Sequence, residues 1–182
     1  IDAMDLVDRA GAQFIALAST SKPGSLVDIS DILEELTDAE KAAEEAVQLD
    51  PAVPLGWIAR VYSMAGRLDV QGIRGKNKDT DAALGLADDV AKRFPQHPLA
   101  HRVKSMVHDV RLELVLAERS ITQSINLSPS DGTLYAHRAK LHVAAGRCGQ
   151  AQADIRQAAK HWTGNKSPLS FLQQAVSSCQ PK

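Results

Sequence analysis

Residues 117–151, AERSITQSINLSPSDGTLYAHRAKLHVAAGRCGQA, are the stretch that decides the fold. They begin and end on alanine, and the interval from Ala117 to Ala151 equals the interval from Ala83 to Ala117. Pro95 and Pro129 are separated by the same interval. A fixed period of about 34 residues is typical of the helix–turn–helix unit in repeat proteins. The sequence therefore predicts stacked helix pairs that act through their surface, rather than an enzyme domain.

The composition agrees with a helical core built from small side chains. Of the 182 residues, 44% are hydrophobic but only 4% are aromatic. Alanine at regular intervals lets helices approach one another closely. The net charge of −1 gives no overall basic field, which argues against non-specific binding of nucleic acid. No stretch approaches 18 consecutive apolar residues, so no membrane span is expected.

Breaker residues and caps divide the chain into helices. The expected helical segments are 2–19, 31–36, 37–49, 55–65, 81–94, 98–110, 113–127, 131–145, 148–162 and 167–178. Thr37 is expected to cap the segment that it begins, because Glu40 follows at capping-box spacing. Gly66 is expected just after the end of its helix, where glycine is common. Residues 70–80 are rich in glycine and lysine, which predicts an exposed, flexible loop that does not join the core.

The sequences AVQLDP at residues 46–51 and SINLSP at residues 124–129 resemble the end of a tetratricopeptide repeat (TPR). The last repeat matches the family pattern of an aromatic, small residues and a turn glycine at Tyr135, Ala139, Gly146, Ala151, Ile155 and Ala158. The resemblance covers about residues 37–162 and implies an all-α fold, a right-handed α-solenoid of helix–turn–helix repeats. Residues 1–36 would form an N-terminal helix and linker or a degenerate first repeat, and residues 163–182 a capping helix.

The resemblance also implies a binding surface, because the first helix of each pair lines a concave face that holds a peptide or a partner helix. The family's groove positions fall on Arg102, Met106, Asp109, Thr133, Ala136 and Lys140. The repeat around Trp57 carries an insertion of about ten residues, and Arg60 is its best polar candidate. Arg60, Arg102 and Lys140 together predict a basic groove suited to an acidic segment or a terminal carboxylate. The alternative is that these are solvated charges on helix surfaces.

The two cysteines are expected to lie close to one another. Cys148 opens the second helix of the last repeat, and Cys179 closes the terminal helix. The two helices should run antiparallel and have similar lengths, about 14 residues for the first and 12 to 13 for the second, at a rise of 1.5 Å per residue. This arrangement brings the two sulfurs together. A disulfide and two unpaired cysteines both remain open. A bond would indicate an oxidising compartment such as a periplasm, whereas unpaired cysteines would favour the cytoplasm.

The sequence supports metal binding and catalysis less than it supports a protein-binding surface. His97 and His101 have i,i+4 spacing and His108 follows seven residues later, but a zinc site needs three or four converging ligands. Hydrogen-bonded histidines are the stronger hypothesis, because His101 and His108 occupy positions of core aromatics in the family. The sequence GIRGK at residues 72–76 lacks the spacing of a phosphate-binding loop. Neither G-x-S-x-G nor H-E-x-x-H occurs, so we expect no enzyme, cofactor or metal.

We therefore expect a protein–protein interaction scaffold or adaptor, with a bacterial envelope, secretion or pilus assembly as one setting. The alternative is a sensory or regulatory domain of a larger transcriptional regulator or nucleotide cyclase. The sequence begins at Ile1 without a methionine, which indicates a fragment or a processed form. The residues before Ile1 would distinguish the two, because a signal peptide favours the first and a DNA-binding or cyclase domain the second.

Overall fold

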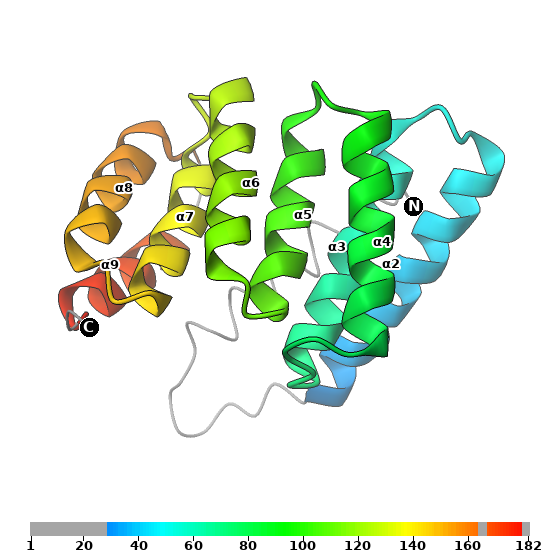
Figure 1. Ribbon diagram of the computed structural model, residues 1–182, viewed down its shortest axis with the longest axis horizontal. Helices are drawn as coiled ribbons and strands as arrows, with labels where there is room; N and C mark the ends of the chain where they lie inside the picture. Colours follow the sequence, from blue (N-terminus) through cyan, green and yellow to red (C-terminus); the bar gives the residue numbers. More distant parts are fainter. Residues whose placement is uncertain (1–28, 164–166, 180–182) are drawn as a thin grey trace.

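The computed structural model describes residues 29–163 and 167–179, and in this part of the chain every regular element is an α-helix. The helices are α2 (Ile29–Leu49), α3 (Pro54–Val70), α4 (Lys78–Arg93), α5 (Pro98–Val110), α6 (Leu114–Leu127), α7 (Gly132–Ala144), α8 (Cys148–His161) and α9 (Ser167–Ser177). The helix expected over residues 2–19 lies outside the described residues. Figure 1 shows the array running from α2 at one end to α8 and α9 at the other, with α3 behind α4.

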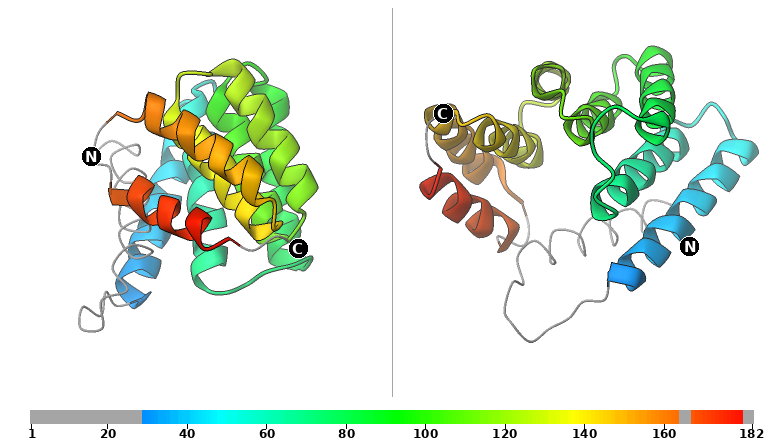
Figure 2. Two further views of the ribbon diagram at one scale, coloured as in Figure 1. Left: turned by 90° about the vertical axis from the view of Figure 1, so that its left-hand side faces the viewer. Right: turned by 60° about the horizontal axis from the view of Figure 1, so that its bottom comes forward.

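The repeat pattern groups α3 with α4, α5 with α6, and α7 with α8, and α3 also packs extensively against α2. The right-hand view of Figure 2 shows the row bent into an arc, with α3, α5 and α7 on its inner side and α4 and α6 on its outer side. The three alanines that set the repeat period, Ala83, Ala117 and Ala151, are all fully buried. The predicted all-α solenoid of helix pairs is therefore confirmed for the described residues.

One hydrogen bond recurs in each of the three pairs. A ring near the start of the first helix donates to the carbonyl of the proline six residues earlier. The contacts are Trp57 Nε1 to Pro51 O (3.0 Å), His101 Nε2 to Pro95 O (2.8 Å) and Tyr135 Oη to Pro129 O (3.0 Å). A carbonyl oxygen can only accept, so the ring atom is the donor in every case. His101 can therefore replace an aromatic residue here, because its ring also carries a donor.

Helix α3 is one turn longer than its counterparts. A residue with positive φ follows the end of each first helix. It comes 15 positions after the ring residue in the first pair (Trp57 to Gly72) and 11 positions after it in the other two (His101 to Leu112 and Tyr135 to Gly146). Four inserted residues therefore extend the helix. Gly66 does not end α3, as the sequence predicted, but lies buried inside it, where an added Cβ would meet Leu36 at 3.3 Å.

The remaining insertion is mostly exposed, as predicted, but Ile73 and Thr80 join it to the core, contrary to the prediction. Gly75 N donates to Val110 O at 2.9 Å, and Ile73 packs against the apolar cluster of α3, α4 and α5. Thr80 is fully buried and donates through Oγ1 to Gly75 O at 2.7 Å. Asn77 and Thr80 cap α4 reciprocally. Asn77 and Thr80 satisfy backbone groups at the start of α4, which allows Thr80 to be buried, whereas Lys76, Lys78 and Asp79 stay exposed.

The break predicted at Thr37 is also absent, because α2 continues through this position without interruption. Thr37 Oγ1 donates to Leu33 O, four residues earlier in the same helix, at 2.6 Å. The hydroxyl is thus used inside the helix instead of capping a new one. The domain division expected between residues 36 and 37 therefore falls within α2.

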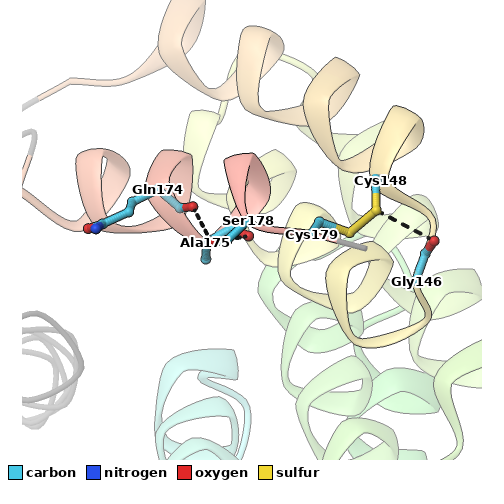
Figure 3. Close-up of a disulfide and its surroundings, with 6 residues drawn as sticks. All are labelled: Gly146, Cys148, Gln174, Ala175, Ser178 and Cys179. Carbon is cyan, nitrogen blue, oxygen red and sulfur yellow. Dashed lines mark hydrogen bonds between the residues drawn. A yellow bond between two sulfur atoms is a disulfide. The ribbon is translucent and has the colours of Figure 1, made fainter. Parts of the chain in front are cut away.

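Helix α9 closes the row by packing against α7 and α8. Its buried Leu169 follows Tyr135 by one full repeat period, so α9 occupies the place of the first helix of a further pair. A disulfide joins Cys148 at the start of α8 to Cys179, just after α9 (Figure 3). The two α-carbons lie 5.6 Å apart, within the roughly 7 Å that a disulfide spans.

The start of α7 lies unusually close to the end of α8. An added Cβ on Gly132 would lie 2.7 Å from Ala158 O and 2.9 Å from Trp162 N. The equivalent first residues of α3 and α5 are Pro54 and Pro98. Only glycine fits at this contact without moving backbone atoms.

We therefore predict opposite effects of two alanine substitutions. Gly132→Ala should lower the free energy of unfolding by about 1–3 kcal/mol, because it overpacks a contact with backbone. Gly85→Ala should raise it by about 1 kcal/mol, because Gly85 lies inside α4 with nothing within 4 Å of an added Cβ. Urea unfolding measures both values. If Gly132→Ala were also stabilising, the close approach of α7 and α8 would be wrong.

Candidate functional site

The candidate site lies on the inner side of the arc, where polar side chains of α5 and α7 meet. Three contacts cross between the helices, about one per turn: Arg102 Nη1 to Thr133 Oγ1 (3.4 Å), His137 Nε2 to Ser105 Oγ (3.2 Å) and Lys140 Nζ to Asp109 Oδ2 (3.0 Å). We call these six residues the α5–α7 seam. The structure thus brings together Arg102, Asp109, Thr133 and Lys140, four of the residues that the resemblance nominated.

The other two nominated residues on these helices flank the seam. Met106 is half-buried and packs against the apolar cluster of α3, α4 and α5. Ala136 packs against a second cluster, formed by α7, α8 and α9. The seam therefore lies between two apolar regions, and polar contacts take the place of the apolar packing that joins α3 to α5.

His137 is a neutral member of the seam. Ser105 Oγ donates its one hydrogen to Ala117 O at 2.8 Å, so His137 Nε2 must donate to Ser105. Burial lowers the pKa of His137 well below its ordinary value, and the nearby charges of Arg102 and Lys140 lower it further. The imidazole is therefore uncharged at neutral pH. Sequence periodicity missed this pair, because the separation of Ser105 and His137 is two positions short of the repeat period.

Arg102 is the cation of the seam whose hydrogen-bonding capacity is least used. Lys140 already pairs with the buried carboxylate of Asp109. Arg102 donates only to the hydroxyl of Thr133, and its Nε is buried without a hydrogen-bond partner in the described structure. A buried, unsatisfied guanidinium N–H is costly, so a carboxylate arriving here would gain a strong partner.

Comparisons with known proteins agree on the architecture. No family model and no curated protein matches the sequence. The crystal structure of TTC0263, a thermophilic TPR protein in Thermus thermophilus, is 14% identical, with a TM-score of 0.65 over 97% of this chain and 100% of that one. A chain of the APC/C hetero-tetramer Cut9-Hcn1 is 17% identical, with a TM-score of 0.64 over 97% of this chain and 32% of that one. This chain has the tetratricopeptide-repeat fold. At these identities the likeness establishes the fold alone.

Arg60 does not share the inner face with Arg102, contrary to the prediction. Three residues after each ring, a polar side chain reaches back to the second helix of the preceding TPR unit. The contacts are Arg60 to Glu44 (3.1 Å), Lys104 to Asp88 (2.7 Å) and Arg138 to Thr122 (3.2 Å). Arg60 is thus equivalent to Lys104 and Arg138. The ten-residue insertion obscured this alignment in the sequence, whereas the position relative to Trp57 reveals it.

The candidate metal ligands serve other purposes. His101 anchors its TPR unit, as described above, and His108 Nδ1 lies 2.8 Å from Glu113 Oε2. His97 stands at the N-cap position of α5, without a side-chain capping hydrogen bond. Among the residues that the structure describes, no three histidine, cysteine or acidic side chains converge as metal ligands. No helix in the same part of the chain is long and apolar enough to span a membrane.

Glu113 is held between three helices by charged hydrogen bonds. Arg111 Nε donates to it at 3.0 Å, and Arg111 also pairs with Asp81 at the start of α4. The hydrogen bonds from Arg111, with help from His108 and Lys76, lower the pKa of Glu113 to about 2, although burial opposes the shift. The carboxylate therefore stays charged in the folded protein well into the acid range.

We predict a pH-dependent contribution to stability from Glu113. Its folded-state pKa lies below that of the unfolded chain, so the stabilisation is complete above the ordinary value of 4.5 and is lost as the pH falls towards 2. Glu113→Gln should then lower the free energy of unfolding strongly at pH 7 and less at pH 3. Urea unfolding at the two pH values tests this, with the exposed Glu34→Gln as the control. An effect that is equal at both pH values would contradict the prediction.

Proposed function

We propose that this chain is a protein–protein interaction scaffold whose inner face binds an acidic segment of a partner, with Arg102 as the anchor. The supporting observation is the Arg102 guanidinium, which has a buried Nε without a partner and forms no ion pair among the described residues. A guanidinium can bind both oxygens of a carboxylate at once. Met106, one turn along the same helix, would supply adaptable apolar contact beside it.

The similar structures support the scaffold part of the proposal. One is described as a TPR protein, and the other belongs to a hetero-tetramer of two named proteins. The chain spans the full length of the first and about a third of the second. A repeat array presents an extended inner surface, which suits binding of a partner segment better than catalysis in a closed pocket.

The charges of the seam indicate which residues carry the binding. Arg102 and Lys140 are positive, Asp109 is negative and His137 is neutral, which leaves one net positive charge. An incoming carboxylate would have to compete with Asp109 for Lys140, whereas Arg102 is available without displacing another carboxylate. Arg102 should therefore contribute more to binding than Lys140.

Peptide binding tests this proposal. The probes are acidic 12-residue peptides with a free carboxyl end, measured by fluorescence anisotropy beside sequence-matched peptides in which lysine replaces the acidic residues. Arg102→Ala should weaken binding of the acidic set at least tenfold, because a charged hydrogen bond contributes about 1.5–3 kcal/mol. Lys140→Ala should weaken it less. The control is Lys104→Ala on the same helix, whose ammonium pairs with Asp88 of α4, and it should leave binding unchanged.

Two outcomes would count against the proposal. If the acidic peptides bind no better than the lysine peptides, the proposal that the partner segment is acidic is wrong. Binding that survives Arg102→Ala together with Lys140→Ala, with unaltered salt dependence, would move the interaction away from the inner face.

We also propose that the protein works in an oxidising compartment, such as that of an envelope, secretion or pilus assembly. The Cys148–Cys179 disulfide supports this setting, since such bonds persist mainly outside the reducing cytoplasm. Alkylating thiols in intact producing cells before lysis should leave both cysteines unmodified. Complete alkylation of the native protein would place it in a reducing compartment.

A further inference from the structure

The exposed large apolar side chains of the described residues gather mainly at two turns. Their exposed fractions are 87% for Leu49 and 44% for Val53 at the turn between α2 and α3, and 60%, 68% and 38% for Leu112, Val115 and Leu116 at the turn between α5 and α6. We call the first pair the α2–α3 tip and the second group the α5–α6 tip. Such grouping is informative, because single exposed apolar residues are common but clusters mark contacts.

The α5–α6 tip contains a backbone strain that the free chain does not explain. Leu112 has a φ of 62°, whereas the equivalent residues that end α3 and α7 are Gly72 and Gly146. Glycine adopts this conformation freely, and a leucine Cβ is crowded in it. The Leu112 side chain is nevertheless mostly exposed, so its burial does not offset the strain. Val115 likewise stands where the next TPR unit has Gly149. Strain of this kind points to a contact that lies outside the chain.

The two tips cannot meet within one molecule. Figure 1 shows the α2–α3 turn at the upper edge of the row and the α5–α6 turn at its lower edge. An exposed charge also lies one helical turn away from each tip, along α2 in one case and along α6 in the other. Glu45 precedes Leu49 by four residues, and Arg119 follows Val115 by four. Neither forms an ion pair among the described residues, and their charges are opposite.

We propose that copies of this chain associate head to tail, with the α2–α3 tip of one copy against the α5–α6 tip of the next. The partner is a second copy of the chain, because the same chain carries both apolar tips and both charges at matching spacing. Glu45 would face Arg119 of the next copy. An open hollow of about 540 Å³ runs along α6 past Val115 and Arg119, which gives the acidic end of α2 room to lie there. The α5–α7 seam stays free for another partner.

A head-to-tail contact has a distinctive consequence for assembly. The two surfaces of the contact differ, so an assembly of any size still has one unused tip at each of its two ends. The association therefore does not stop at a dimer unless the rotation closes a ring. The contact is small, so we expect it to be weak, with dissociation constants from about 10 µM to about 1 mM.

Sedimentation velocity of the full chain over this concentration range tests the proposal. The wild type should grow beyond a dimer as its concentration rises. Leu49→Ser removes the most exposed side chain of one tip and Leu112→Gly the strained side chain of the other, and each variant alone should associate at least tenfold more weakly. An equimolar mixture of the two variants should form a one-to-one dimer and nothing larger, because each supplies the tip that the other lacks. Both positions are exposed, and Leu112→Gly relieves strain, so both variants should unfold no earlier than the wild type on heating.

Charge reversal gives an independent test. Glu45→Arg and Arg119→Glu should each weaken association, and the two changes combined in one chain should restore it. A wild type that remains monomeric throughout the range overturns the proposal. So does a Leu49→Ser variant that still assembles fully, since the α5–α6 tip would then pair with itself. A mixture of the tip variants that stays monomeric also overturns it.

Discussion

The hydrogen bond from a ring to the carbonyl of a preceding proline is the contact on which the rest of the array depends. Trp57, His101 and Tyr135 each tie the start of a first helix to the chain just beyond the preceding second helix. Each bond contributes only about 1 kcal/mol, but it fixes where one pair begins relative to the last. Residues at the same distance in sequence from the ring therefore occupy equivalent places in each pair. One example is the polar side chain three residues after the ring, which contacts the helix before it.

The inner face shows what happens where this regular stacking becomes polar. The buried apolar residues form separate clusters, one in α3, α4 and α5, one in α6 and α7, and one in α7, α8 and α9. The α5–α7 seam lies where the first of these ends. Hydrogen bonds between neutral and charged groups hold the two helices together there. Because such bonds need defined geometry, they specify the spacing of α5 and α7 while leaving Arg102 incompletely satisfied.

The repeat period was enough to predict the all-α fold, because small buried residues recur wherever two helices cross. Ala83, Ala117 and Ala151 are buried as that argument requires. The period could not place Arg60, since an insertion lies between it and the regular repeats and shifts every count made across it. Nor could it show that Thr80 is buried or that Thr37 bonds within its helix, because a polar side chain can serve solvent, a cap or a backbone carbonyl equally well. Of the candidate site, the resemblance nominated Arg102, Asp109, Thr133 and Lys140, while the pair of Ser105 and His137 emerged only from the fold.

The place of α9 has a consequence for how this array could change in length. Repeat proteins lengthen and shorten when whole units are duplicated or lost, and a new unit must dock on the last helix pair. Here α9 already occupies that docking position, and a covalent bond between Cys148 and Cys179 holds it there. A unit added after α8 would have to displace α9 and separate the two cysteines. Units added within the row would leave this end intact, so growth is easiest from the interior of the solenoid.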